Sequence, residues 1–414
     1  MAVIHFPLSL SLSLSLSKTR PEVVALINKY RKAANEEMAR KAEYVKRQAK
    51  KSHSCVGRIH CSTPFSARAQ AQFGVPQNIP GGKDDPTNIG VQMWWAKTKD
   101  YMNKIVRVQE RYEGVRDECQ NKHADCTKWA TRGECQANPN YMNKNCLPAC
   151  RMCHYLIFDE RCPYDGSDET NIWKEPNQVN QLFERITTEP YYVSKYTPTI
   201  HSQPTQEEGG GGPWLVSLEN FLSTDECNRL IELGAQRGYE HSKDVGTQQA
   251  DGTYSSADNP DRTSSNAWCL DECFRDPVTQ TVLQRIENLT DIPDQYSEYL
   301  QLLKYEEGQK YGVHHDFTHH SLDRAEGHRL LTVFLYLNDV QEGGETNFPE
   351  LQVSVQPKCG RAVVWPSVLN EDYNAIDQRT DHQALPVVKG IKYGANAWIH
   401  MRDFKDVFER GCAT

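Results

Sequence analysis

Residues 311–316 read Tyr-Gly-Val-His-His-Asp, and this stretch decides how the C-terminal half of the chain is interpreted. Along a β-strand, side chains at positions i and i+2 point to the same face. His314 and Asp316 can therefore offer an imidazole and a carboxylate to one metal ion. A distant histidine would complete a set of two histidines and one carboxylate. That set leaves coordination positions open and suits non-haem iron(II) handling dioxygen.

The His-x-Asp triplet alone is a weak signal. Among 14 histidines in 414 residues, roughly one such triplet is expected by chance. A second copy does occur at His123 and Asp125, inside a cysteine-rich segment. We interpret that copy as surface chemistry of a small disulfide-bonded unit, so support for the first copy must come from its surroundings.

An ordered series of motifs surrounds His314. Lys-Tyr-Glu-Glu-Gly-Gln-Lys-Tyr (304–311) precedes it, and Arg-Leu-Leu-Thr-Val-Phe-Leu-Tyr-Leu-Asn (329–338) follows. Next come Gly-Gly-Glu-Thr-Asn-Phe-Pro (343–349), Pro-Lys-Cys-Gly-Arg-Ala-Val-Val-Trp (357–365) and His-Gln-Ala-Leu-Pro-Val-Val-Lys-Gly-Ile-Lys-Tyr (382–393). This series closely resembles the catalytic domain of prolyl 4-hydroxylases.

The resemblance implies a metal site and a cosubstrate site. His314, Asp316 and His382 match the iron ligands of the family. Lys392, ten residues after His382, matches the lysine that pairs with the distal carboxylate of 2-oxoglutarate. A dicarboxylate buried in a barrel needs a cation at its far end, because its desolvation is otherwise uncompensated.

Four further residues match positions around the family's site. Tyr305 and Thr346 match positions that help hold the cosubstrate. Arg329 and Trp398 match positions that line the substrate groove. Without the resemblance, Tyr305 and Trp398 would be ordinary core aromatics.

The reaction that the resemblance implies is hydroxylation of peptidyl proline. Dioxygen and 2-oxoglutarate would be consumed, and 4-hydroxyproline, succinate and carbon dioxide would be formed. Iron(II) and ascorbate are the implied cofactors. A proline-rich protein or peptide is the implied partner, since its polyproline II form is already extended.

The pattern along residues 213–405 predicts a mainly β domain with flanking helices. Ser223 and Glu226 form a capping box that opens a helix. Short strands separated by Gly and Pro follow after residue 293, which favours a double-stranded β-helix, or jelly roll. The strands are expected over 214–218, 299–305, 330–337, 353–356, 361–365, 385–388 and 391–399.

Six cysteines crowd into residues 119–153 and indicate disulfides, with a zinc cluster as the competing interpretation. Their spacing resembles a ShK domain, a fold named for a sea-anemone toxin. The resemblance implies the pairs Cys119–Cys153, Cys126–Cys146 and Cys135–Cys150. The toxin's functional Lys-Tyr pair aligns with Asn140 and Tyr141, so the pore-blocking lysine is missing. A substrate-tethering or partner-binding module and an inert appendage both remain open.

The expected organisation has six parts. Residues 1–20 form a leader or weak signal segment, and residues 21–115 a basic, helix-prone and irregular region that is partly disordered. A ShK-like domain over 116–154, a linker over 155–212, the oxygenase domain over 213–405 and a tail over 406–414 follow. The linker ends in four glycines, Gly209 to Gly212, which favours a flexible boundary.

Composition narrows the partners and the compartment. A net charge of −8 gives no sign of nucleic-acid binding. The clustered cysteines favour the endoplasmic reticulum or secretory pathway. The Leu-Ser run near the N-terminus reads equally as a signal segment or as low-complexity sequence. Membrane association and oligomeric state stay open.

Two other functions are compatible with the motifs. The chain could be a binding protein in which the ShK-like module acts and the barrel is an inactive scaffold. Such a protein would be expected to carry a damaged metal triad, whereas His314, Asp316, His382 and Lys392 are all present. It could also be a 2-oxoglutarate oxygenase that acts on another substrate.

Overall fold

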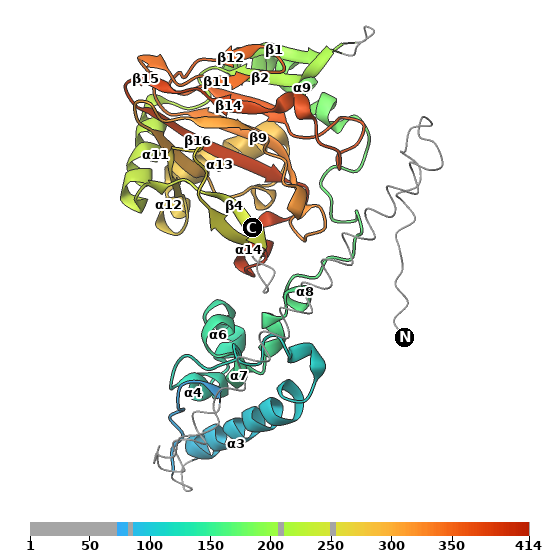
Figure 1. Cartoon of the computed structure of the whole chain (residues 1–414), viewed down its shortest axis with the longest axis vertical. Coiled ribbons are helices and arrows are strands. Elements are labelled where there is room, and N and C mark those ends of the chain that lie inside the picture. The colour runs from blue at the N-terminus through green and yellow to red at the C-terminus, as the bar shows by residue number, and fades with distance from the viewer. Residues whose placement is uncertain (1–72, 82–85, 206–210, 249–253, 414) are drawn as a thin grey trace, which may run out of the picture. The chain divides into compact units, whose positions relative to one another are not determined.

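The computed structural model describes residues 73–81, 86–205, 211–248 and 254–413 (Figure 1). The leader over 1–20 and most of the basic, helix-prone and irregular region over 21–115 lie outside these residues. The described chain contains a cysteine-rich helical module followed by a β-rich domain. No helix in this described part is both long and apolar enough to cross a membrane.

An eight-stranded antiparallel sheet forms the larger layer of the β-rich domain. Its order is β1-β2-β13-β9-β16-β7-β6-β3. The strands are β1 (Thr199–Pro204), β2 (Gly211–Leu218), β3 (Glu240–His241), β6 (Ser265–Trp268), β7 (Gln301–Tyr305), β9 (Arg329–Tyr336), β13 (Ala362–Pro366) and β16 (Lys392–His400).

A four-stranded antiparallel sheet of order β12-β11-β14-β8 forms the smaller layer. Its strands are β8 (Tyr311–His314), β11 (Thr346–Phe348), β12 (Val353–Val355) and β14 (His382–Ala384). Two short ribbons complete the β structure: β10 (Glu342–Gly343) with β15 (Val387–Lys389), and β4 (Asp244–Gln248) with β5 (Tyr254–Ala257). The sheet-rich architecture with flanking helices confirms the predicted jelly-roll fold class.

Alternation along the strands divides the larger sheet into two faces. On β9, Leu331, Val333 and Leu335 pack in one buried cluster, whereas Phe334 and Tyr336 pack in another. The second cluster also contains residues of the smaller sheet, so it fills the space between the two sheets. Side chains on this inner face can therefore reach whatever the barrel encloses.

Helices cover the outer face of the larger sheet. They are α9 (Gln178–Thr188), α10 (Pro190–Tyr196), α11 (Thr224–Arg237), α12 (Glu272–Arg275) and α13 (Pro277–Thr290), and α14 (Phe404–Glu409) ends the domain (Figure 1). The predicted capping box is present: Ser223 accepts a hydrogen bond from the Glu226 backbone N–H, and the Glu226 carboxylate accepts from the Ser223 N–H. Apolar side chains of α9, α11 and α13 share one core with the sheet.

The expected linker over 155–212 is wrong for most of its length. It contains α8 (Phe158–Arg161), α9, α10 and β1, and β1 extends the larger sheet by pairing with β2. Val179, Leu182, Phe183 and Ile186 recur at helical spacing and are buried. Scattered Pro and charged residues obscured this pattern. The glycines at 211 and 212 begin β2 rather than a flexible boundary.

The cysteine-rich module consists of short helices stapled by three disulfides. The helices are α3 (Pro86–Tyr101), α4 (Cys126–Thr131), α5 (Glu134–Ala137), α6 (Pro139–Asn145) and α7 (Leu147–Cys150). The bonds are Cys119–Cys153, Cys126–Cys146 and Cys135–Cys150, the same pairs that the resemblance implies. So small a core depends on such cross-links.

Two more disulfides lie outside the module. One joins Cys269 to Cys273, which lie four positions apart in the sequence. Cys162–Cys412 was not anticipated, and it joins the segment after the module to the C-terminal tail across 250 residues. Cys227 and Cys359 are the free cysteines of the described chain.

Candidate active site

The two candidate histidine ligands face each other across the smaller sheet. His314 ends β8 and His382 begins β14, and they are direct partners in the strand register. Asp316 follows two residues after His314. One ligand atom from each of the three residues lies within 4.8 Å of the others, and this is the one His/Cys/Asp/Glu group of its kind in the described chain.

Hydrogen bonds orient both imidazoles. His314 Nδ1 lies 2.9 Å from the Gly312 carbonyl oxygen, and His382 Nδ1 lies 3.0 Å from that of Thr380. A carbonyl oxygen can only accept, so each Nδ1 carries the proton and donates it. Each Nε2 therefore keeps its lone pair for a metal ion.

Burial and neighbouring charge give His314 and Asp316 the protonation states of metal ligands. Burial lowers the pKa of His314 to about 3, so its imidazole is neutral. Burial alone would raise the pKa of Asp316, but His382, His314 and Arg329 outweigh it and lower that pKa to about 2. The Thr332 hydroxyl also donates to Asp316 Oδ2 at 2.6 Å and restrains its rotation. Neutral imidazoles and an ionised carboxylate are what a divalent metal requires.

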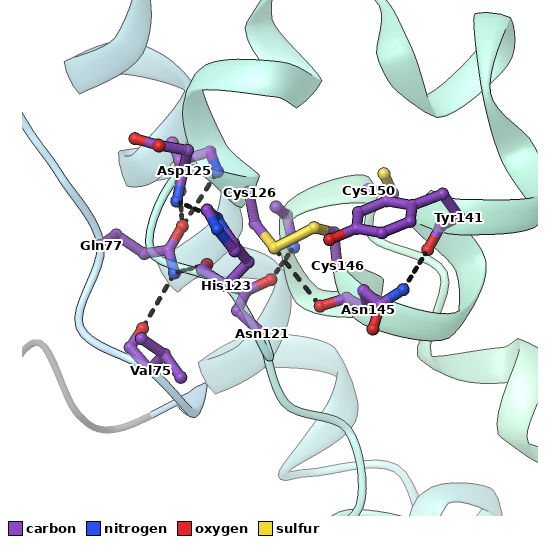
Figure 2. Close-up of a disulfide and its surroundings, with 12 residues drawn as sticks. Val75, Gln77, Asn121, His123, Asp125, Cys126, Tyr141, Asn145, Cys146 and Cys150 are labelled. Carbon is purple, nitrogen blue, oxygen red and sulfur yellow. Dashed lines mark hydrogen bonds between the residues drawn. A yellow bond between two sulfur atoms is a disulfide. The ribbon is translucent and has the colours of Figure 1, made fainter.

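The second copy of the triplet has a different environment. His123 Nδ1 accepts a hydrogen bond from the Asp125 backbone N–H at 3.1 Å, and Gln77 donates to the His123 carbonyl oxygen (Figure 2). The His123 ring stacks on Trp129 with centroids 4.4 Å apart. His123 and Asp125 thus make their contacts within the cysteine-rich module, beside the Cys126–Cys146 bond.

Lys392 is a buried cation without a partner. Its side chain is 1% exposed, and Nζ has no hydrogen-bond partner in the structure. Three aromatic rings surround Nζ, of Tyr305 at 5.1 Å, Phe334 at 5.2 Å and Tyr336 at 5.4 Å. Burial lowers the pKa of Lys392 to about 7, although Glu345 opposes this shift. A lysine in this environment needs an anion, and the second carboxylate of a dicarboxylate would supply one.

One cavity connects the metal group to Lys392. His314 and His382 line it near the metal position, and Lys392, Tyr305 and Thr346 line the remainder. Tyr305 and Lys392 are partners across β7 and β16, and Thr346 Oγ1 accepts a hydrogen bond from the Tyr336 hydroxyl at 2.6 Å. The structure therefore brings together every residue expected to hold metal or cosubstrate.

Arg329 and Trp398 lie beyond the cavity, toward the other end of β16. The Arg329 guanidinium sits 3.6 Å from the centre of the Trp398 ring, and Arg329 Nε donates to Glu298 at 2.5 Å. His400 Nε2 lies 2.8 Å from the same Glu298 oxygen. Trp398 is the register partner of Thr332, which donates to Asp316, so Trp398 shares the metal-facing side of the sheet.

Sequence reasoning missed several residues around the site. Glu298 and His400 anchor Arg329, and Tyr311 stacks on His314 with ring centroids 3.6 Å apart. Alternation could have found His400, because it lies eight residues after Lys392 on one strand. Arg262, whose guanidinium lies 4.5 Å from the centre of the Tyr311 ring, and Glu298 reach the site from distant segments.

Comparison with known proteins agrees with this geometry. Residues 300–400 match the 2OG-Fe(II) oxygenase superfamily, and residues 118–153 match the ShK domain-like family. The chain is 33% identical over 252 residues to Probable prolyl 4-hydroxylase 8 of Arabidopsis thaliana, covering 53% of this chain and 84% of that protein. It is 29% identical over 250 residues to Prolyl 4-hydroxylase subunit alpha-2 of Gallus gallus, covering 59% of this chain and 43% of that one.

A solved structure also matches part of the chain. The viral collagen prolyl hydroxylase of Paramecium Bursaria Chlorella virus-1, in complex with 2-oxoglutarate, aligns with a TM-score of 0.36 and 25% identity. The alignment covers 45% of this chain and 95% of the viral one.

Proposed function

The chain belongs to the prolyl 4-hydroxylase family, and from this membership we propose that its barrel hydroxylates peptidyl proline at C4. It is an iron(II)- and 2-oxoglutarate-dependent dioxygenase. One atom of dioxygen enters the proline hydroxyl group. The other enters succinate, which forms from 2-oxoglutarate with release of carbon dioxide.

The metal site fits iron(II). His314, Asp316 and His382 would hold the ion through two Nε2 atoms and one carboxylate oxygen, which leaves positions for the cosubstrate and dioxygen. When bound, iron(II) supplies the activation of dioxygen and the oxidative decarboxylation of 2-oxoglutarate. The protein fixes the ligand positions, and the Thr332 hydroxyl holds Asp316 in one orientation.

The single observation that carries the proposal is the unpartnered Lys392 ammonium, which lines the same cavity as the histidine ligands. 2-Oxoglutarate has a keto acid at one end for the metal and a carboxylate at the other for Lys392. Tyr305 and Thr346 would line the sides of the bound cosubstrate. In an oxygenase without a dicarboxylate cosubstrate, the buried Lys392 ammonium would stay unpaired, and its desolvation would be uncompensated.

The peptide would enter from the opposite end of β16. Arg329, clamped by Glu298 and stacked on Trp398, offers a fixed cation and an aromatic wall there. A polyproline II segment presents flat rings and free carbonyl oxygens that match such a wall. We therefore assign a proline-rich protein or peptide as the substrate and ascorbate as the reductant that keeps the iron active.

The endoplasmic reticulum is the proposed compartment. Five disulfides occur in the described chain, and such bonds form and persist in oxidising environments. We also propose that the oxygenase domain begins before α9 rather than at residue 213, because α9, α10 and β1 complete its core and sheet.

The test is incubation of the full chain with iron(II), ascorbate, 2-oxoglutarate and a panel of proline-rich peptides, read by mass spectrometry. The expected product carries one added oxygen on proline, and amino-acid analysis identifies it as 4-hydroxyproline. Succinate formation without any modified peptide would instead indicate an oxygenase with another substrate. Absence of both products would favour the inactive-scaffold alternative.

A further inference from the structure

A segment outside the oxygenase motifs contacts the oxygenase domain at Arg324. The Arg324 guanidinium lies 4.6 Å from the centre of the Phe158 ring and 5.1 Å from that of Tyr254. Phe158 begins α8, and Tyr254 begins β5. The His320 ring also contacts Tyr254, with centroids 4.7 Å apart. Arg324 thus joins α8 to the β4–β5 ribbon.

The β4–β5 ribbon reaches the metal site at its other end. Asp244 begins β4, and its Oδ1 accepts hydrogen bonds from Arg262 at 2.9 Å and from the Tyr311 hydroxyl at 3.2 Å. The Tyr311 ring stacks on the metal-facing His314. The position of the ribbon therefore sets where Asp244, Arg262 and Tyr311 lie beside the site.

The Cys162–Cys412 disulfide keeps Phe158 in place. Cys162 follows α8 directly, and Phe158 packs with Ala325 against the buried cluster of Cys162, Val407 and Cys412. Two hydrogen bonds reinforce the contact: Arg410 donates to the Arg161 carbonyl oxygen at 3.0 Å, and Arg161 donates to that of Gly411 at 3.3 Å.

We infer that Phe158 is a positioning residue for the cosubstrate cavity, which Tyr311 lines, and that it acts through Arg324 on the β4–β5 ribbon and is held by the Cys162–Cys412 bond. Phe158 lies between the cysteine-rich module and the barrel in sequence, outside every motif of the oxygenase domain. A cation between two rings favours one arrangement of its neighbours by about twofold to thirtyfold. The inference rests on the proposed function only for its kinetic readout.

Hydrogen exchange of the full chain tests the inference without any substrate. Phe158→Ala should speed exchange in residues 244–248 and 254–257 while β9 and β16 keep their wild-type rates. The double variant Cys162→Ser/Cys412→Ser should have the same effect. Phe158→Tyr keeps the ring and should behave as wild type, and so should Asp159→Ala, which changes an exposed neighbour. Wild-type exchange of the ribbon in Phe158→Ala would overturn the inference.

Steady-state kinetics then separate positioning from general loss of structure. Phe158→Ala should raise the 2-oxoglutarate KM by about twofold to thirtyfold, with kcat and the peptide KM within about twofold of wild type. Arg324→Gln provides a second variant that leaves the Phe158 pocket filled and should give the same pattern. An equal change in all three parameters, or faster exchange throughout the domain, would contradict a positioning role. If the wild-type chain modifies no peptide, the proposed function fails while the exchange experiment still decides this inference.

Discussion

Lys392 is the residue whose environment is hardest to explain without a ligand. A buried ammonium without a hydrogen-bond partner is costly, so its retention indicates an anion that the protein binds. The sequence could predict His314 and Asp316 from strand alternation, and His382 and Lys392 through the family resemblance. It could not predict Glu298 or Thr332, because their contacts with Arg329 and Asp316 depend on register across the sheet.

Removing the Lys392 charge should weaken cosubstrate binding. Loss of one partner of a buried ion pair typically costs about 3–5 kcal/mol, so Lys392→Ala should raise the 2-oxoglutarate requirement at least roughly a hundredfold. A titration of succinate formation measures this change. Lys389→Ala is the matched control, since Lys389 is exposed at the end of β15. An unchanged requirement in Lys392→Ala would exclude Lys392 as the cosubstrate anchor.

The same lysine should make cosubstrate binding depend on pH. Because the pKa of Lys392 is about 7 in the free protein, its charged form falls as pH rises above that value. The apparent Kd of 2-oxoglutarate should be level at lower pH and rise roughly tenfold per unit above about pH 7. Calorimetric titration across this range measures it. Lys392→Arg stays charged and should give a flatter profile, and a flat profile in the wild type would contradict the assignment.

At the scale of elements, strand and helix periodicity predicted most of the barrel. The strands expected at 214–218, 330–337 and 391–399 are present within a few residues as β2, β9 and β16. Among the missed elements were α8, α9, α10 and β1, which lie in the segment expected to be a linker. The helical spacing of the buried residues of α9 is present in the sequence, but the sheet against which they pack is formed by segments far away in the chain.

The core position of α9 can be tested by one substitution. Phe183 is fully buried and stacks on Trp214 of β2 with ring centroids 5.5 Å apart. Phe183→Ala should lower the free energy of unfolding of the oxygenase domain by about 3–5 kcal/mol, measured by urea denaturation. Val193→Ala on the neighbouring α10 is the control, because Val193 is 40% exposed. Equal, small effects of the two changes would show that α9 is not part of this core.

At the scale of the whole molecule, the spacing of the cysteines predicted the disulfides of the small module. It did not predict the long-range disulfide between Cys162 and Cys412. The Cys162–Cys412 bond joins residues that are 250 positions apart. Nothing in the neighbourhood of either cysteine marks the other, so only the folded chain identifies the pair. The bond restrains the segment that follows the module, and it gives that segment a structural role in the oxygenase domain.

Peptide mapping without reduction should recover the five bonds of the structure. Cys227 and Cys359 should be alkylated as free thiols once the protein is unfolded. Metal analysis should find no stoichiometric zinc in the module, since its six cysteines are paired. Free thiols at Cys119 to Cys153 that hold zinc would refute both the disulfide module and the proposed oxidising compartment.

The most direct measurement compares peptide hydroxylation and succinate formation in variants of the metal group and of the second His-x-Asp triplet. Asp316→Ala and His382→Ala should reduce both products to background while the protein stays folded, because each removes one ligand of the metal group. His123→Ala should keep wild-type activity, since His123 serves only the cysteine-rich module. Hydroxylation that survives Asp316→Ala, or that is lost in a folded His123→Ala, would contradict the assignment of the catalytic site.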